Sequence, residues 1–193
     1  DGEFSFAGQY STFLNVSSGS LIEKYKGVIA SLFNQRALFY YKTKGFQEYD
    51  MVMSVGVLEM IDAKAGGVMY SRDPNDPDSN TVLISAVRGL GKCVVDGTIT
   101  PETYALSRDP EIKIVQKRIP EQTTMLVCKP DGGLEETVVD TSIKGMPCLT
   151  EEEVKRLAQF AISLENHFGS PQDIEWAIGK DNQLYILQSR PLR

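Results

Sequence analysis

The chain has 193 residues, of which 41% are hydrophobic, so it is long enough to bury a core as one domain or two small lobes. Its net charge of −6 argues against a nucleic-acid partner and against binding to an anionic membrane surface. Its three cysteines are widely spaced without a CxxC pattern, which indicates reduced thiols in a cytoplasmic protein. No apolar run is long enough to span a bilayer, so we expect no membrane partner.

The first feature in chain order is a short polar turn. Gly8 and Gln9 interrupt an apolar stretch, and Ser11 and Thr12 follow them. Glycine lets the backbone approach a ligand closely, and hydroxyl and amide groups are typical donors to phosphate. A turn with small polar residues is more often only a turn, and this stretch alone favours that simpler interpretation.

A long helix is predicted from Ser20 to about Lys44. Ser20 and Glu23 have the spacing of a capping box, and Gly45 is expected to end the helix. Apolar residues recur along it at helical spacing and are expected to face the core. These residues are Leu21, Tyr25, Val28, Ile29, Leu32, Phe33, Leu38 and Tyr41.

The middle of the chain is predicted to be rich in strands. We expect them at residues 51–60, 66–70, 81–87, 111–119, 123–128 and 138–139. The glycine-rich stretch at 88–97 lacks the complete dinucleotide-binding and P-loop patterns, which argues against Rossmann and Walker folds. Lys92, beside Gly91, has the chemistry to contact a phosphate, although a surface lysine is the commoner case.

The clearest helix is predicted to begin at Thr150, which forms a capping box with Glu153, and to end at Gly169. His167 lies in its last turn, where a structural role near the helix dipole is favoured over catalysis. Its expected buried stripe is Val154, Leu157, Ala158, Ala161, Leu164 and Phe168.

The stretch from Ser170 to Pro191 is predicted to form a β-hairpin, because polar and apolar residues alternate on both sides of a polar turn. A two-residue turn at Asp181 and Asn182 would set the register. The expected pairs are Asp173 with Arg190, Glu175 with Gln188, Trp176 with Leu187, and Ile178 with Tyr185. A slip of one residue would scatter the polar members of this set.

Two interpretations of this hairpin remain open. Two carboxylates, an amide and a guanidinium on one face suit a divalent cation and a phosphate chain. Alternating charges are also usual on the solvated face of an antiparallel hairpin, where an Asp173–Arg190 pair contributes little. The hairpin alone favours the solvated face, and the motifs in the rest of the chain reverse that preference.

Several motifs occur together in a fixed order: SFAGQYSTFLNV, GVMYSRDP, GLGK, PQDIEWA and LYILQSRPL. Over nearly the whole chain they resemble the nucleotide-binding domain of phosphoenolpyruvate synthase (pyruvate, water dikinase) and of pyruvate, phosphate dikinase. The resemblance implies an α+β, ATP-grasp fold, in which two lobes clamp ATP. Residues 1–193 would be an N-terminally truncated part of it: 1–19 a phosphate-loop segment, and 20–193 a C-terminal lobe with an antiparallel sheet and flanking helices.

The resemblance also implies site residues. Glu175 and Gln188 would be Mg²⁺ ligands, Asp173 would position the metal or the attacking group, and Arg190 would contact the transferring phosphate. The implied ATP-binding residues are Gly8, Gln9, Ser11 and Thr12 at the phosphates, Leu58, Glu59, Met60 and Ile61 at adenine, and Lys92. Two of these depart from the family pattern, because Leu58 stands where Gln is usual and Lys92 where Glu is usual.

The implied function is transfer of a phosphoryl group from ATP, through a carrier histidine in another domain, to pyruvate, giving phosphoenolpyruvate. The implied partners are a phosphohistidine domain and a pyruvate-binding domain of the same parent chain, and a homodimeric parent enzyme is compatible with this. The fragment alone is expected to be inactive. Three alternatives stay open: an acceptor of the rifampin or glucan type, a non-catalytic nucleotide-sensing module, and a purely structural domain.

Overall fold

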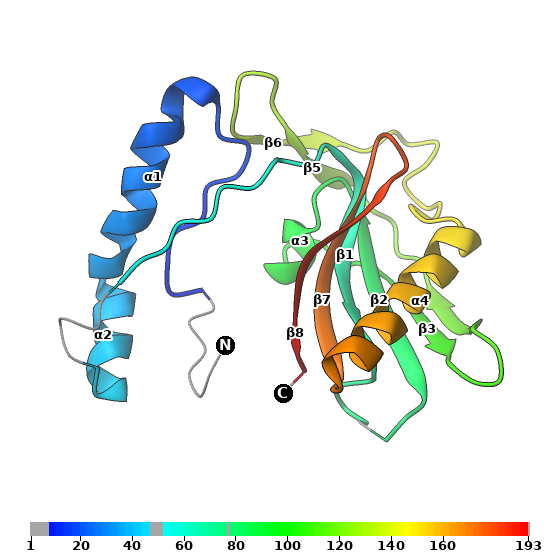
Figure 1. Cartoon of the computed structure of the whole chain (residues 1–193). Coiled ribbons are helices and arrows are strands. Elements are labelled where there is room, and N and C mark those ends of the chain that lie inside the picture. The colour runs from blue at the N-terminus through cyan, green and yellow to red at the C-terminus, as the bar shows by residue number, and fades with distance from the viewer. Residues whose placement is uncertain (1–7, 47–51, 77, 193) are drawn as a thin grey trace. The chain divides into compact units, whose positions relative to one another are not determined.

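A computed structural model of the chain describes residues 8–46, 52–76 and 78–192 (Figure 1). The chain divides into two compact units. The first comprises Asp1–Met60 and Cys128–Leu134, and the second comprises Ile61–Val127 and Glu135–Arg193. No helix within the described ranges is both long and apolar enough to cross a membrane.

The second unit is built on a six-stranded sheet in which each neighbouring pair of strands is antiparallel. The strand order is β4-β3-β2-β1-β7-β8. The strands are β1 (Ala63–Tyr70), β2 (Thr81–Arg88), β3 (Glu102–Ser107), β4 (Lys113–Arg118), β7 (Gln172–Gly179) and β8 (Leu184–Pro191). Helix α4 (Glu151–Phe168) packs against β1, β2, β3 and β7 (Figure 1). This mixture of an antiparallel sheet and packed helices agrees with the predicted α+β class.

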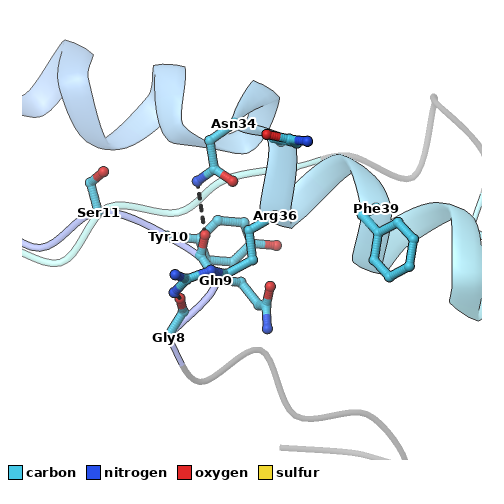
Figure 2. Close-up of a pocket in the computed structure, with 8 residues that line it drawn as sticks. Gly8, Gln9, Tyr10, Ser11, Asn34, Arg36 and Phe39 are labelled. Carbon is cyan, nitrogen blue, oxygen red and sulfur yellow. Dashed lines mark hydrogen bonds between the residues drawn. The ribbon is translucent and has the colours of Figure 1, made fainter.

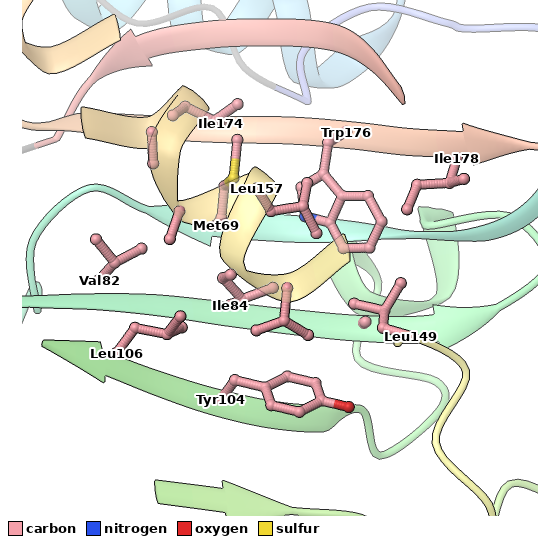
Figure 3. Close-up of a cluster of buried hydrophobic side chains, with 14 of the residues drawn as sticks. Met69, Val82, Ile84, Tyr104, Leu106, Leu149, Leu157, Ile174, Trp176 and Ile178 are labelled. Carbon is pink, nitrogen blue, oxygen red and sulfur yellow. The ribbon is translucent and has the colours of Figure 1, made fainter. Parts of the chain in front are cut away.

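The core of this unit lies between α4 and one face of the sheet (Figure 3). Met69, Ile84 and Trp176 project from three strands to meet Leu157 of α4, and all four side chains are fully buried. Successive residues of a strand point to opposite faces, so the residues between these core positions face away from α4. That second face of the sheet carries the candidate site described below.

The predicted boundaries of α4 are confirmed. Thr150 and Glu153 form a complete capping box, and Gly169 ends the helix with a positive φ of 70°. The first part of the predicted stripe is buried, from Val154 to Ala161. Phe168 is 56% exposed, so the prediction that it belongs to the buried stripe is wrong. The helix is fixed by its caps and by this apolar stripe together.

A short helix, α3 (Lys92–Val95), and strand β3 were not predicted from the sequence. The glycines before α3 allow its backbone to lie directly on β1. A Cβ atom at Gly66 would lie 2.7 Å from the amide nitrogen of Gly91, and a Cβ at Gly91 would lie 2.5 Å from that of Gly67. Backbone-to-backbone packing therefore explains this glycine-rich stretch without a ligand.

The helical part of the first unit differs from the prediction of one long helix. It contains η1 (Ser18–Ser20), α1 (Leu21–Ala30), η2 (Ser31–Phe33) and α2 (Gln35–Lys44). The break lies at Asn34, whose extended backbone (ψ 155°) stops one helix and whose side chain caps the next. The predicted capping box at Ser20 is also wrong, because the Ser20 hydroxyl donates to the Ser17 carbonyl instead. Gly45 ends α2 with a φ of 77°, as expected.

The predicted buried stripe of this helical region is largely wrong. Leu32 and Tyr41 are buried, but Phe33 is 66% exposed, and the exposed set also includes Leu21, Tyr25 and Leu38. The break at Asn34 changes the rotation of α2 relative to a continuous helix, so residues spaced along one predicted stripe no longer share a face.

The predicted strand at 51–60 is not formed by its described residues, 52–60, which have no regular secondary structure; Met51 lies outside the described residues. Alternating apolar residues form a strand only where a neighbouring strand and a core are available. The strands expected at 111–119 and 123–128 correspond to β4 and β5 (Thr124–Cys128), whereas the strand expected at 138–139 overlaps β6 (Leu134–Val138) only at Val138. Strands β5 and β6 form a two-stranded sheet.

Candidate functional site

The polar residues of the β7–β8 hairpin share the sheet face that lies opposite α4. Asp173 pairs with Arg190, and Glu175 pairs with Gln188, in the antiparallel register between the two strands. Both pairs match the prediction. Because directly opposed residues on one face have Cβ atoms roughly 5 Å apart, the hairpin brings two carboxylates, an amide and a guanidinium together.

The turn end of the hairpin differs from the prediction. Trp176 pairs with Ile186, and Ile178 pairs with Leu184, so the expected partners Leu187 and Tyr185 are each wrong by one residue. The loop has three residues rather than two: the Asn182 amide donates to the Gly179 carbonyl (2.9 Å), and Asn182 itself has a φ of 63°. This is the common pattern of a tight turn followed by a left-handed residue.

A β-bulge reconciles this turn with the polar register. The register shifts between Glu175 and Trp176, which leaves Leu187 as the extra residue of β8. Before the bulge, Leu184 and Ile186 turn toward the core, and after it Gln188 and Arg190 stay on the opposite face. Without the bulge, strict alternation would put all four of these residues on one face of the sheet. The bulge therefore separates the two apolar residues from the two polar ones.

Arg190 and Asp173 form a directed ion pair. The Nε and Nη2 atoms of Arg190 donate to one carboxylate oxygen of Asp173, at 2.9 and 2.7 Å. The Asp173 side chain is 15% exposed and that of Arg190 is 39% exposed. The pair is thus partly shielded from water, and the interaction fixes the plane of the guanidinium on the sheet face.

Glu175 and Gln188 differ from this ion pair. Within the described residues, neither side chain has a hydrogen bond or an ion pair. Burial raises the pKa of the Glu175 carboxyl, the Asp173 carboxylate raises it further, and Arg190 opposes the shift. A partly buried carboxylate without a partner is favourable for a cation, and carboxylate and amide oxygens are ligands that suit Mg²⁺. These two side chains therefore have the donor chemistry that suits a hard divalent ion.

Strand β1 extends the same face. Val68 pairs with Glu175, and Tyr70 pairs with Asp173. Burial, and secondly the Asp173 charge, raise the pKa of Tyr70, and Arg190 opposes the shift. The prediction from the sequence missed Tyr70, because only the pairing of strands about a hundred residues apart places it there.

A pocket in the first unit contains part of the predicted phosphate loop (Figure 2). It has a volume of about 610 Å³ and is lined by Gly8, Gln9, Tyr10, Ser11, Asn34, Gln35, Arg36 and Phe39. Three of the four predicted loop residues are in this lining, and Thr12 is not. The prediction missed Asn34 and Arg36, although the N-cap preference of asparagine was a readable local signal.

The remaining predicted residues belong to neither of these two groups. Leu58 is 78% exposed. It lies in a stretch without regular secondary structure that also contains Glu59, Met60 and Ile61. The division between the two units falls between Met60 and Ile61. Lys92 opens α3, and its ammonium forms an ion pair with Asp96 one turn later, so part of its charge is neutralised locally.

Comparisons with known proteins agree on one family. Residues 1–193 match the family described as "Pyruvate phosphate dikinase, AMP/ATP-binding domain". The chain is 36% identical, over 98% of its length, to the phosphoenolpyruvate synthase of Pyrococcus furiosus, and 35% identical, also over 98%, to a protein named "Probable phosphoenolpyruvate synthase" in Methanocaldococcus jannaschii. It is 33% identical over 97% to the rifampicin phosphotransferase of Bacillus subtilis.

The chain spans only part of these relatives: 24%, 16% and 21% of their respective lengths. The match thus concerns one shared region of longer proteins, and that region is a nucleotide-binding domain. The chain belongs to the family of pyruvate phosphate dikinase AMP/ATP-binding domains.

Proposed function

We propose that this chain is the ATP-binding part of a kinase that moves a phosphoryl group from ATP, through a carrier histidine in another domain of its parent protein, to pyruvate. The product would be phosphoenolpyruvate. Two relatives whose names describe them as phosphoenolpyruvate synthases support pyruvate as the acceptor of the phosphoryl group. The observation that carries the ATP chemistry is the register of β7 and β8, which sets Asp173, Glu175, Gln188 and Arg190 on one face.

Each of these side chains has a proposed role that follows from its environment. Glu175 and Gln188 would hold Mg²⁺, since both present oxygen atoms that have no partner among the residues that the structure describes. The bound ion would neutralise charge on the phosphate oxygens during transfer. Arg190 would bind the transferring phosphate through its remaining N–H groups, while Asp173 keeps the guanidinium in place and helps position the reacting group.

The other contacts with ATP are proposed from the family resemblance. Gly8, Gln9, Ser11 and Thr12 would contact the phosphates, the 58–61 stretch would lie against adenine, and Lys92 would lie near the nucleotide. We further propose an ATP-grasp arrangement, in which residues 1–19 supply the phosphate loop and residues 20–193 the C-terminal lobe. The Lys92–Asp96 ion pair favours a secondary role for Lys92.

A second candidate keeps the ATP chemistry and changes the acceptor. The rifampicin phosphotransferase of Bacillus subtilis is similar to the chain over 97% of its length, which supports this alternative. Phosphoryl donation from ATP needs the same alignment and charge neutralisation for either acceptor. The acceptor assay must therefore use the full-length protein, with pyruvate and rifampicin compared as substrates.

Calorimetric titration of the full-length protein with ATP, with and without Mg²⁺, tests the proposal. Glu175→Gln removes the proposed metal-binding charge, and Glu136→Gln is a matched control at an exposed position in β6. We expect Mg²⁺ to strengthen ATP binding in the wild type and in the control. In the presence of Mg²⁺, the affinity of the Glu175 variant for ATP should be lower than that of the wild type by roughly tenfold or more. The metal assignment would be overturned if the wild type bound ATP as strongly in EDTA as in Mg²⁺, and if the variant bound ATP as strongly as the wild type.

A further inference from the structure

Three side chains, one in η2 and two at the start of α2, bind the backbone of the loop at residues 8–11. The Asn34 Nδ2 atom donates to the Gln9 carbonyl at 2.9 Å (Figure 2). The Arg36 Nη1 atom donates to the Gly8 carbonyl, also at 2.9 Å. The Ser31 hydroxyl accepts from the Ser11 amide at 3.0 Å. Each of these contacts joins a side chain to a main-chain group, so the loop's path depends on side chains 20 to 28 residues away in the sequence.

Two of these side chains are themselves held by the helices. The Oδ1 atom of Asn34 accepts from the Ala37 amide at 2.7 Å and so caps α2. Ser31 is buried, and its hydroxyl donates to the Val28 carbonyl at 2.6 Å. Asn34 therefore uses one end of its amide for the helix and the other for the loop. Because the Asn34 side chain is fixed by its bond to the Ala37 amide, the Gln9 carbonyl that it binds has little freedom to move.

The direction of these bonds fixes how the loop presents its amides. In a trans peptide the N–H points opposite to the C=O. Because the carbonyl of Gly8 is directed to Arg36, the N–H of Gln9 points away from that guanidinium. The same argument applies to the peptide after Gln9, whose carbonyl is directed to Asn34. The N–H groups of Gln9 and Tyr10 are therefore directed away from the side chains that bind the loop, and backbone N–H groups are usual donors to phosphate oxygens.

We propose that Asn34 and Arg36 are positioning residues, which orient the loop at residues 8–12 for the phosphates of the nucleotide. The inference rests on the proposed function, in which this loop contacts the phosphates, and it adds two residues outside the loop. Neither residue needs to touch the nucleotide for this role. Their removal therefore affects ligands that carry phosphates and spares those that do not.

The test compares ATP with adenosine, by calorimetry on the full-length protein. Asn34→Ser keeps an oxygen that can cap α2 but loses the donor to Gln9. We expect a roughly three- to tenfold weaker affinity for ATP, the effect of one lost hydrogen bond, and an unchanged affinity for adenosine. Asn34→Ala also loses the cap, so it should show the same loss for ATP together with a lower Tm. Asn75→Ser is the control, at an exposed asparagine of the second unit.

Amide hydrogen exchange without nucleotide provides a second measurement. Exchange at residues 9–11 should be faster in Asn34→Ser than in the wild type, and unchanged in Asn75→Ser. Unchanged exchange in the Asn34 variant, or an equal loss of affinity for ATP and adenosine, would overturn the positioning role while leaving the proposed function intact. If the wild type binds no ATP, the proposed function fails and the positioning role fails with it.

Discussion

The polar face of β7–β8 and the loop at residues 8–11 are held in place by different means. The first is part of a six-stranded sheet, where main-chain pairing and the buried core under Trp176 set the position of each polar side chain. The second is held by hydrogen bonds between its backbone and the side chains of Ser31, Asn34 and Arg36, of which Ser31 accepts and the other two donate. A site on a sheet is thus fixed by many weak contributions, whereas this loop depends on a few side chains.

This difference predicts where substitutions act. A polar residue on the sheet face can be replaced without moving the backbone of its neighbours, because the hydrogen bonds between the strands stay intact. A side chain that holds the loop cannot be replaced without freeing the backbone it binds. Substitutions on the sheet face and in the loop should therefore differ in their effects.

The largest expected effect is that of removing the core side chain beneath the polar face. Trp176→Ala should lower the free energy of unfolding by about 3–5 kcal/mol, because it leaves a cavity where a fully buried indole packs against α4. Denaturant unfolding measures this change. Phe168→Ala, at a half-exposed position on α4, is the control and should cost less than about 1 kcal/mol. Equal costs for the two variants would contradict the assigned core.

A second prediction concerns the far end of the N-terminal segment. Asn15 Nδ2 donates to the carbonyls of Lys129 and Gly133, each at 2.7 Å, and Asn15 has a positive φ of 51°. Asn15→Ala should cost about 2–4 kcal/mol, through two lost hydrogen bonds and a backbone conformation that alanine disfavours. Asn15→Gly keeps the conformation available, so unfolding measurements should show a smaller loss for glycine. A glycine variant less stable than the alanine variant would contradict this account.

A third prediction tests the ion pair on the sheet face. Asp173→Asn leaves the partly buried Arg190 without its carboxylate and should cost about 1–2 kcal/mol. The pKa of Glu175 should fall in this variant, because the Asp173 charge helps to raise it in the wild type. An NMR titration of the Glu175 carboxyl measures that fall, with Asp76→Asn as an exposed control. An unchanged pKa would show that the two carboxylates do not interact.

The smallest expected effect is a gain in stability. The pKa of Glu175 is higher in the folded protein than in the unfolded chain, so its charged form disfavours folding. This penalty is absent at low pH, where both states are protonated, and develops as the pH rises through the unfolded and then the folded pKa. Glu175→Gln should therefore slightly stabilise the metal-free protein at pH 7 and have no such effect near pH 3. Greater stabilisation at the lower pH would contradict the direction of the shift.

The sequence predicted the elements whose signals are local. The capping box at Thr150 and the stop at Gly169 defined α4. The pairing of Glu175 with Gln188 was predicted from a two-residue turn, and it is found because the one-residue bulge at Leu187 compensates for the three-residue loop. The bulge at Leu187 was missed, because the run of apolar residues in β8 is compatible with either register. The break at Asn34 was missed because apolar spacing continued across it, although asparagine is a strong N-cap.

The parts that could not be predicted depend on contacts between distant residues. Tyr70 joins the polar face only through the pairing of β1 with β7. Arg36 reaches the Gly8 carbonyl across twenty-eight residues of chain. The stretch from 52 to 60 has the alternation of a strand but forms none, since strand formation requires a partner that local sequence does not specify.

The most direct test of the central claim is a crystal structure of the full-length protein with Mn²⁺ and a non-hydrolysable ATP analogue. Anomalous scattering from Mn²⁺ locates the ion independently of the protein density. The account predicts an anomalous peak between the side-chain oxygens of Glu175 and Gln188, with a phosphate group within hydrogen-bonding distance of Arg190. A nucleotide-bound structure with the ion elsewhere, and with no phosphate on this face of β7–β8, would contradict it.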